Sequence, residues 1–92
     1  MILTDKFKVV AVSENTNSFG LYQCVMVARS GKGYKACASY LNIPKQGDVL
    51  DIPVILDANG KPTSNYDFSS KGFEIPEKIV DAPKEILEEI WK

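Results

Sequence analysis

Residues 29–36, RSGKGYKA, place Lys32 between two glycines, a pattern that could belong to a phosphate-binding loop or to the tip of a charged hairpin. In nucleotide-hydrolysing enzymes such a loop has a glycine five positions before its Gly-Lys pair and a serine or threonine directly after the lysine. Here these two positions hold Met26 and Gly33. The segment lacks both the backbone cradle and the magnesium-binding hydroxyl, so it does not predict a nucleotide-hydrolysing enzyme.

Composition disfavours other catalytic arrangements as well. The chain contains no histidine, which excludes Ser-His and Cys-His pairs and leaves carboxylates and lysines as candidate proton carriers. Asp48 and Asp51 are interpreted as a turn residue and a strand-surface residue. Cys24 and Cys37 are too few ligands for a zinc site. The sequence therefore predicts no catalytic residue, no metal site and no cofactor, and an enzyme is the weakest hypothesis.

The glycine-flanked lysine lies in a region that combines aromatic and basic side chains. Aromatic rings stack on unpaired bases for about 1–3 kcal/mol each, and lysine and arginine attract the phosphates, so the combination is typical of single-strand binding. The alternative is that the aromatic residues fill the core and that Lys32 keeps an exposed turn in water. The candidate nucleic-acid-binding residues are Phe19, Tyr22, Arg29, Lys32, Tyr34, Lys35 and Tyr40.

Charge is divided unevenly along the chain, whose net charge is −1. Residues 1–72 carry eight lysines or arginines and six acidic residues, which gives +2, whereas residues 73–92 carry three and six, which gives −3. The body is mildly basic and the end is acidic. An ordinary domain that ends in a solvated acidic helix would show the same distribution.

Length and composition predict a single small globular domain. The chain has 92 residues, of which 45% are hydrophobic and 25% charged, values close to the average for globular proteins. No apolar run approaches the length of a membrane span, and no export leader precedes the first strand-like segment. We therefore expect a cytoplasmic protein, no membrane partner, and reduced cysteines rather than a disulfide.

The elements that would position these side chains are strands, because apolar and polar residues alternate over the first two thirds of the chain. The expected antiparallel strands are KFKVVAVS (6–13), LYQCVMVAR (21–29), YKACASYL (34–41), VLDIPVILD (49–57) and the short SNYDFSS (64–70). Pro53 cannot donate to a ladder and is expected at an edge or bulge. Asn59 and Gly60 suit a tight hairpin turn.

The loop length between the second and third strands determines which side chains share a face. An even-numbered loop places Arg29 opposite Tyr34, and an odd-numbered loop reverses the partners of one strand. The sequence leaves both registers open.

The end of the chain changes to a helical period. In DAPKEILEEIWK, Asp81 is expected to cap a helix, Pro83 suits its first turn, and one face carries apolar side chains. These side chains are Ile86, Leu87, Ile90 and Trp91. The helix either docks on the barrel, joins two subunits, or binds a partner through Ile86, Ile90 and Trp91. Before it, SSKGFEIPEK is expected to be a linker, because Gly72 and Pro76 interrupt both periods.

Five short strands with a turn about every ten residues favour a small closed or partly open barrel over a sandwich. The order FKVVAVSEN, a strand, a charged hairpin, YKACASYL and QGDVLDIPV resembles the OB-fold single-stranded DNA-binding proteins, and the small phage members are nearest in size. The resemblance covers roughly residues 6–56 and includes the Lys-Gly-Asp-like turn of Lys45, Gly47 and Asp48. An SH3-like barrel is the alternative.

The strand pattern and the resemblance together predict a mainly β fold with a five-stranded OB-like barrel over residues 1–72. The change of period predicts an acidic linker and a C-terminal helix over residues 73–92. The resemblance also implies that Tyr22, Tyr34 and Tyr40 stack on bases, and that phosphates meet the basic residues Arg29, Lys32 and Lys35. If the protein is phage-encoded, its location is the bacterial host cytoplasm. The family's tail is longer, disordered and tipped with acidic and apolar residues, whereas this one ends in IWK and has a helical pattern.

Two hypotheses of function follow. The first is non-catalytic binding of single-stranded DNA, with RNA not distinguished, by stacking and phosphate contacts. The second is a small β-barrel module that binds or inhibits a protein through its acidic C-terminal helix. A homodimer is compatible with either hypothesis.

Overall fold

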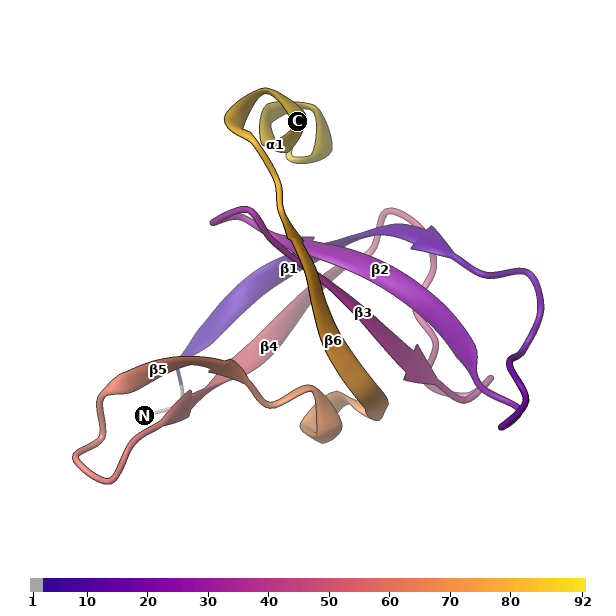
Figure 1. Cartoon of the computed structure of the whole chain (residues 1–92), viewed down its shortest axis with the longest axis horizontal. Helices are drawn as coiled ribbons and strands as arrows, with labels where there is room; N and C mark the ends of the chain where they lie inside the picture. The colour runs from indigo at the N-terminus through magenta and orange to yellow at the C-terminus, as the bar shows by residue number, and fades with distance from the viewer. Residues whose placement is uncertain (1–2) are drawn as a thin grey trace.

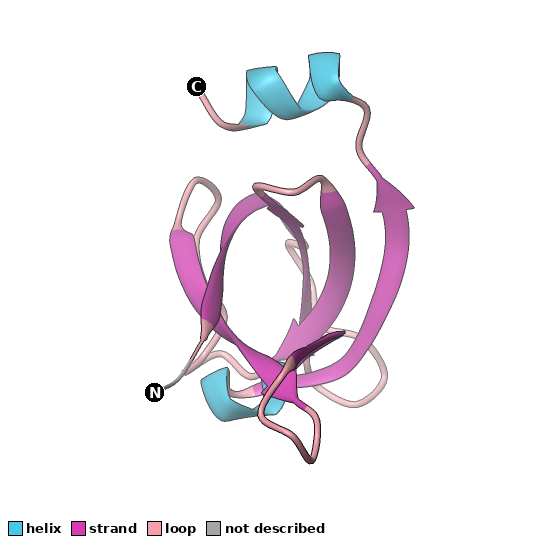
Figure 2. Cartoon of the chain, turned by 90° about the vertical axis from the view of Figure 1, so that its left-hand side faces the viewer, coloured by secondary structure: helices cyan, strands magenta, loops and turns pink. Residues whose placement is uncertain are grey.

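The computed structural model describes residues 3–92 as a strongly curled antiparallel sheet followed by one helix (Figures 1 and 2). The strands are β1 (Thr4–Val12), β2 (Tyr22–Ala28), β3 (Lys32–Ala38), β4 (Val49–Leu56), β5 (Pro62–Tyr66) and β6 (Phe73–Asp81). A 3-10 helix, η1 (Phe68–Lys71), precedes β6, and the helix α1 (Lys84–Ile90) follows it. The expected mainly β class with a C-terminal helix is confirmed, with six strands in place of five.

The six strands lie in the order β5-β4-β1-β2-β3-β6. Strands β1, β2 and β3 follow one another as neighbours, and β4 returns to lie beside β1, which is the Greek-key arrangement. Figure 2 shows the sheet curling into a half-barrel, so that one face of every strand looks inward. Pro53, expected at an edge or bulge, lies in β4, which is flanked by β1 and β5 and is not an edge strand. It lies opposite Thr4, and its carbonyl accepts a hydrogen bond from the Asp67 N–H at 2.8 Å, so the missing N–H faces the segment just beyond the end of β5.

The hairpin of β2 and β3 has the odd-numbered register. Met26 lies opposite Tyr34 and Cys24 opposite Ala36, so these residues share the inner face. Arg29 therefore does not lie opposite Tyr34, and the even-numbered alternative is wrong. The turn needs Gly31, whose φ of 103° is in the left-handed region and whose N–H donates to the carbonyl of Ala28 at 2.9 Å.

The core lies inside the half-barrel around Phe7, which is 0% exposed. Its ring centroid is 5.9 Å from that of Tyr34, 4.9 Å from that of Tyr66 and 5.6 Å from that of Phe68, all in edge-to-face geometry. The other members of this cluster are Val9, Cys24, Met26, Ala28, Ala36, Ala38, Ile52 and Phe73. With Phe73, five aromatic rings thus pack in the interior beside the small alanines of β2 and β3.

The expectation of a linker before the helix is wrong over residues 73–81, which form β6 and pair with β3. Pro76 falls within an irregular stretch of this pairing, and Ile75 beside it has a φ of 51°. Proline is tolerated there because β6 is an edge strand, where one side of the ladder is open to solvent. The fifth strand, expected over residues 64–70, lies earlier in the chain, because β5 spans Pro62–Tyr66 and residues 68–71 form η1.

Helix α1 lies over the tip of the β2–β3 hairpin (Figure 1). The Ala82 N–H donates to the carbonyl of Gly31 at 2.7 Å, and the Arg29 guanidinium lies 5.1 Å from the centroid of the Trp91 ring. Asp81 does not cap the helix, because it is the last residue of β6 and its carboxylate pairs with Lys78 at 3.1 Å. Docking therefore rests on a few contacts at the hairpin tip.

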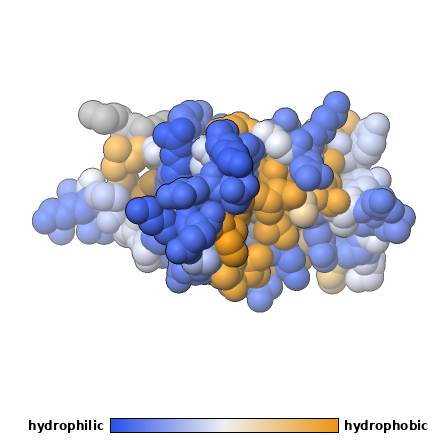
Figure 3. Space-filling model, turned by 90° about the horizontal axis from the view of Figure 1, so that it is seen from above, coloured by the Kyte–Doolittle hydropathy of each residue, from blue (hydrophilic) through white to orange (hydrophobic). Residues whose placement is uncertain are grey.

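Seen from above, hydrophilic side chains cover much of the surface, and apolar side chains are exposed near the middle of this face (Figure 3). On the helix itself Ile86 is 52% exposed, whereas Leu87, Ile90 and Trp91 are half-buried. Within residues 3–92 no helix combines the length and the apolar character that crossing a bilayer requires.

Candidate nucleic-acid interface

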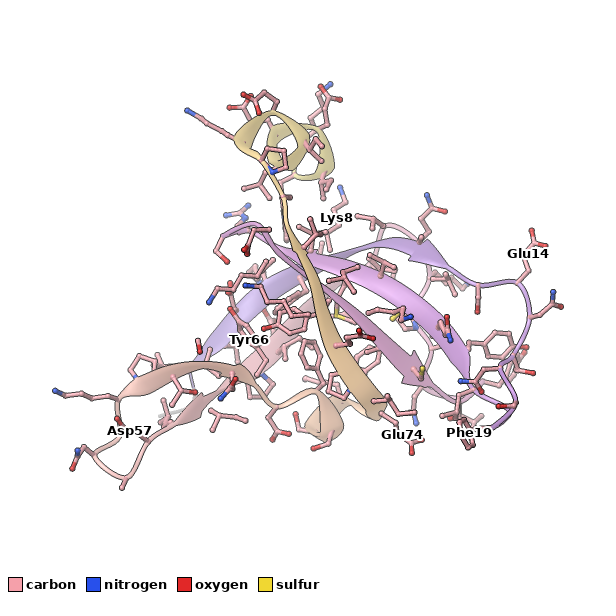
Figure 4. The ribbon with its side chains drawn as sticks, viewed as in Figure 1. Lys8, Glu14, Phe19, Asp57, Tyr66 and Glu74 are labelled. Carbon is pink, nitrogen blue, oxygen red and sulfur yellow. The ribbon has the colours of Figure 1, made fainter. Side chains whose placement is uncertain are left out.

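Large apolar side chains gather at the end of the half-barrel where β2 begins and β3 ends. Phe19 is 76% exposed, Tyr40 78% and Leu41 89%, and Tyr22 is half-buried beside them. Figure 4 labels Phe19 at this end of the molecule. We call Phe19, Tyr22, Tyr40 and Leu41 the aromatic end.

A hydrogen-bonded turn holds Phe19 in solvent. The side-chain oxygen of Asn17 accepts hydrogen bonds from the N–H groups of Phe19 at 2.9 Å and Leu21 at 3.1 Å. Gly20, with a φ of 77°, completes the turn, and the Asn17 amide lies 3.8 Å from the Cys37 sulfur on β3. Phe19 is therefore exposed on an ordered loop that is anchored to the sheet.

A second turn exposes Tyr40 and Leu41. The N–H groups of Asn42 and Ile43 both donate to the carbonyl of Ser39, at 3.0 and 2.9 Å. Tyr40 and Leu41 are the middle residues of this turn, and Ile43 packs against the core just after it. The turn is thus fixed at its base while its two large apolar side chains face water.

Beside the two tyrosines the surface is hollowed over about 660 Å³. The hollow is lined by Val12, Ser13, Tyr22, Tyr40, Leu41, Ile43, Pro44, Lys45 and Gln46. The ring centroids of Tyr22 and Tyr40 are 6.5 Å apart and their planes are inclined at 49°. Because Val12 and Ile43 pack against the core, the hollow has a firm apolar base and a polar side supplied by Ser13, Lys45 and Gln46.

The turn that carries Lys45 is fixed on β1. The Lys45 N–H donates to a carboxylate oxygen of Asp48 at 2.9 Å, and the N–H of Asp48 donates back to the Lys45 carbonyl at 3.0 Å. The Gly47 N–H donates to the carbonyl of Val9 at 2.8 Å. Asp48 is therefore occupied within the turn, and the ammonium group of Lys45 is left as the positive charge of the hollow.

Of the seven candidate residues, the structure brings the rings of Tyr22 and Tyr40 together, and Phe19 lies on the loop that leads into β2 at the same end of the molecule. Tyr34 instead packs in the interior, with its ring centroid 5.0 Å from that of Phe68, so we no longer assign it a stacking role. The lining residues Val12, Leu41 and Ile43 were not predicted, because their apolar character alone does not distinguish a hollow from a core. The sequence singled out Lys45 only as part of the Lys-Gly-Asp-like turn with Gly47 and Asp48, and not as a binding residue.

The candidate basic residues are dispersed. The guanidinium of Arg29 lies over Trp91, and the ammonium of Lys32 lies 5.9 Å from the centroid of the Tyr66 ring. Lys35 lies opposite Val25 and Glu77, on the outer face of the sheet. These three side chains therefore do not surround the aromatic end.

Both cysteines are free and buried, and they lie on opposite faces of the hairpin. Burial raises the pKa of the Cys24 thiol to about 11, and the neighbouring Cys37 adds to this effect. A thiol with so high a pKa is a poor nucleophile near neutral pH. Among the residues that the structure describes, no cluster of three or more cysteine and acidic side chains is placed to hold a metal ion.

Comparison of the chain with protein-family models, with curated proteins and with solved structures found no match.

Proposed function

We propose that this protein binds single-stranded nucleic acid, DNA in the first instance, without catalysis, and that the aromatic end is its contact surface. The observation that carries the proposal is the pair of rings at Phe19 and Tyr40, which are more than three-quarters exposed although hydrogen-bonded turns hold both. Clustered exposure of large apolar side chains marks a binding surface. Bases suit such a surface because each presents a flat π-face to an aromatic ring.

The ring geometry favours stacking on the outer face of Tyr40. A base held between two parallel rings needs a separation of about 7 Å, twice the roughly 3.4 Å between stacked bases. The centroids of Tyr22 and Tyr40 are 6.5 Å apart, but the 49° angle between the rings prevents a flat sandwich. A base can insert between the two rings only if the exposed Tyr40 ring rotates, whereas a base can stack on the outer face of Tyr40 without any rotation.

Electrostatics contribute a smaller part of the binding energy. Among the described residues the ion pairs use Lys6, Lys78 and Lys92, so Lys45 has no carboxylate partner and is available to a phosphate. One or two neutralised phosphates give a slope of about −0.7 to −1.4 in log K against log salt. Affinity should then fall only about 3- to 7-fold between about 50 and 200 mM salt. The Greek-key order of β1–β4, which OB folds share, is compatible with this proposal.

The test is a fluorescence-anisotropy titration with a labelled oligothymidine at these two salt concentrations, with the matching duplex as control. We expect saturable binding of the single strand, weaker binding of the duplex, and the shallow salt dependence. Equal affinity for duplex and single strand would mean that charge alone is responsible. No binding at the lower salt concentration would exclude the proposal.

The second candidate is a protein-interaction module that acts through α1. The observation in its favour is the 52% exposure of Ile86 on a helix of which no residue is buried. Trp91 is engaged at the hairpin tip, so Ile86 and the half-buried Ile90 remain as the candidate contacts. If the partner is a second copy, sedimentation should show a dimer that Ile86→Asp converts to monomer, and nucleic-acid binding should not change.

A further inference from the structure

The two edge strands of the curled sheet are β5 and β6, and a pocket lies where their side chains come close to those of β3. We call it the seam pocket. It is lined by Lys32 and Tyr34 from β3, Ser64 and Asn65 from β5, and Lys78 from β6, and its volume is about 330 Å³. It shares no residue with the hollow of the aromatic end.

Lys32 is unusual in its position. The register places it on the inner face with Tyr34, and its side chain is half-buried. Asp81 lies opposite Lys32 on β6, yet the Asp81 carboxylate pairs with Lys78 at 3.1 Å, and no carboxylate of the described residues pairs with Lys32. The Lys32 ammonium has the Tyr66 ring 5.9 Å away but no counter-charge, so it is free to pair with an anion.

The seam pocket supplies donors from three directions. Besides the two ammonium groups it has the Ser64 hydroxyl, the Asn65 amide and the Tyr34 phenol, and no carboxylate lines it. Two acidic groups of the neighbouring strands already have partners: Asp81 pairs with Lys78, and Asp5 accepts a hydrogen bond from the Tyr66 hydroxyl at 2.8 Å. The Lys78–Asp81 pair is exposed and hence weak, so an incoming anion can compete for Lys78.

We propose that the seam pocket binds a phosphate group, as a phosphomonoester dianion between Lys32 and Lys78. A tetrahedral anion with several acceptor oxygens matches two cations and neutral donors better than a planar carboxylate does. The phosphate belongs either to the end of a nucleic-acid strand or to a small molecule such as a mononucleotide. The proposal does not depend on the aromatic end, because the two sites have no residue in common.

The test is an amide chemical-shift titration of the full chain with inorganic phosphate and, separately, with thymidine 5′-monophosphate. We expect saturable shifts at Ser64, Asn65 and Lys78, and about 10-fold weaker binding in Lys32→Gln, because a hydrogen bond to a charged group is lost. Lys32→Arg should retain most of the affinity. Lys61→Gln, which removes an exposed lysine outside the pocket, is the matched control and should bind as the unmodified protein does.

Absence of saturation, or equal weakening by Lys61→Gln and Lys32→Gln, would overturn the proposal. Oligothymidine with and without a 5′-phosphate distinguishes the two sources. Tighter binding of the phosphorylated strand identifies a nucleic-acid end, whereas mononucleotide binding with no such difference identifies a small molecule. Tyr40→Ala should weaken oligothymidine binding and leave phosphate binding unchanged, so each proposed site can fail independently.

Discussion

Replacing Tyr40 with alanine should remove most of the stacking surface that we assign to the aromatic end. The Tyr40 ring is 78% exposed in the middle of the turn over residues 39–42. The hydrogen bonds of that turn are made by the Ser39 carbonyl, which the substitution leaves in place. Its half-buried neighbour Tyr22 keeps its position in β2. The substitution therefore tests the exposed ring with little effect on the fold.

The size of the effect follows from the stacking energy. Alanine substitution at a base-stacking aromatic residue costs about 1–3 kcal/mol, which corresponds to roughly 5- to 150-fold in Kd. Tyr40 should fall in the lower half of this range, because its 49° inclination to Tyr22 prevents both rings from holding one base. An exposed surface substitution changes the free energy of unfolding by about 0.5 kcal/mol or less.

The assay is oligothymidine anisotropy at low salt, with urea denaturation of each variant in parallel. Tyr40→Phe is the control that keeps the ring and removes the hydroxyl, and it should bind within about 2-fold of the unmodified protein. Phe19→Ala should show a separate loss of similar size. Unchanged affinity in Tyr40→Ala with full binding in the unmodified protein would refute the assignment of the site, and parallel loss of stability would refute the assumption of a purely surface effect.

Three further predictions concern stability. Because burial raises the pKa of the Cys24 thiol to about 11 from an ordinary 9.0, the folded protein retains this proton to higher pH than the unfolded chain. The contribution of this thiol to the free energy of unfolding should then be constant below about pH 9 and fall by up to about 3 kcal/mol towards pH 11. Urea denaturation at several pH values should show a smaller fall in Cys24→Ala, and a fall of the same size would contradict the assignment. In Gly33→Ala, the added Cβ would lie 2.8 Å from a Val80 methyl, which should cost about 1–3 kcal/mol; the same measurement on Gly33→Ala with Val80→Ala should recover part of it. The Trp91 indole N–H is buried with no hydrogen-bond partner among residues 3–92, so Trp91→Phe should change the free energy of unfolding by less than about 1 kcal/mol, whereas Trp91→Ala should speed amide hydrogen exchange in α1.

Local patterns predicted most strands well because alternation is a property of each segment alone. The segments around Phe7 and Met26 alternate clearly, and both residues are fully buried on the inner face. Strand β6 escaped prediction because Gly72 and Pro76 interrupt its alternation and almost all of it is exposed. What makes it a strand is pairing with β3, a contact between segments far apart in the sequence.

Part of the candidate site was predictable because local composition, like local alternation, is a property of a segment alone. Composition pointed to aromatic and basic residues between positions 19 and 40, and three of these aromatic residues do lie at one end of the molecule. The odd-numbered turn of the β2–β3 hairpin decided where Tyr34 lies, since this register directs its ring inward against Phe7 and Phe68. One residue more or less in that loop would have changed the face of every side chain on one strand.

The sequence by itself determined the mainly β class and the C-terminal helix, because hydrophobic period and turn chemistry are local. It also excluded histidine-based catalysis, because composition needs no fold. Only the tertiary structure decided the sixth strand, the separation of Lys32 from Tyr40, and the pocket that joins Lys32 to Lys78. These features depend on the curl of the sheet and on which strands become neighbours, and both arise from packing between distant segments.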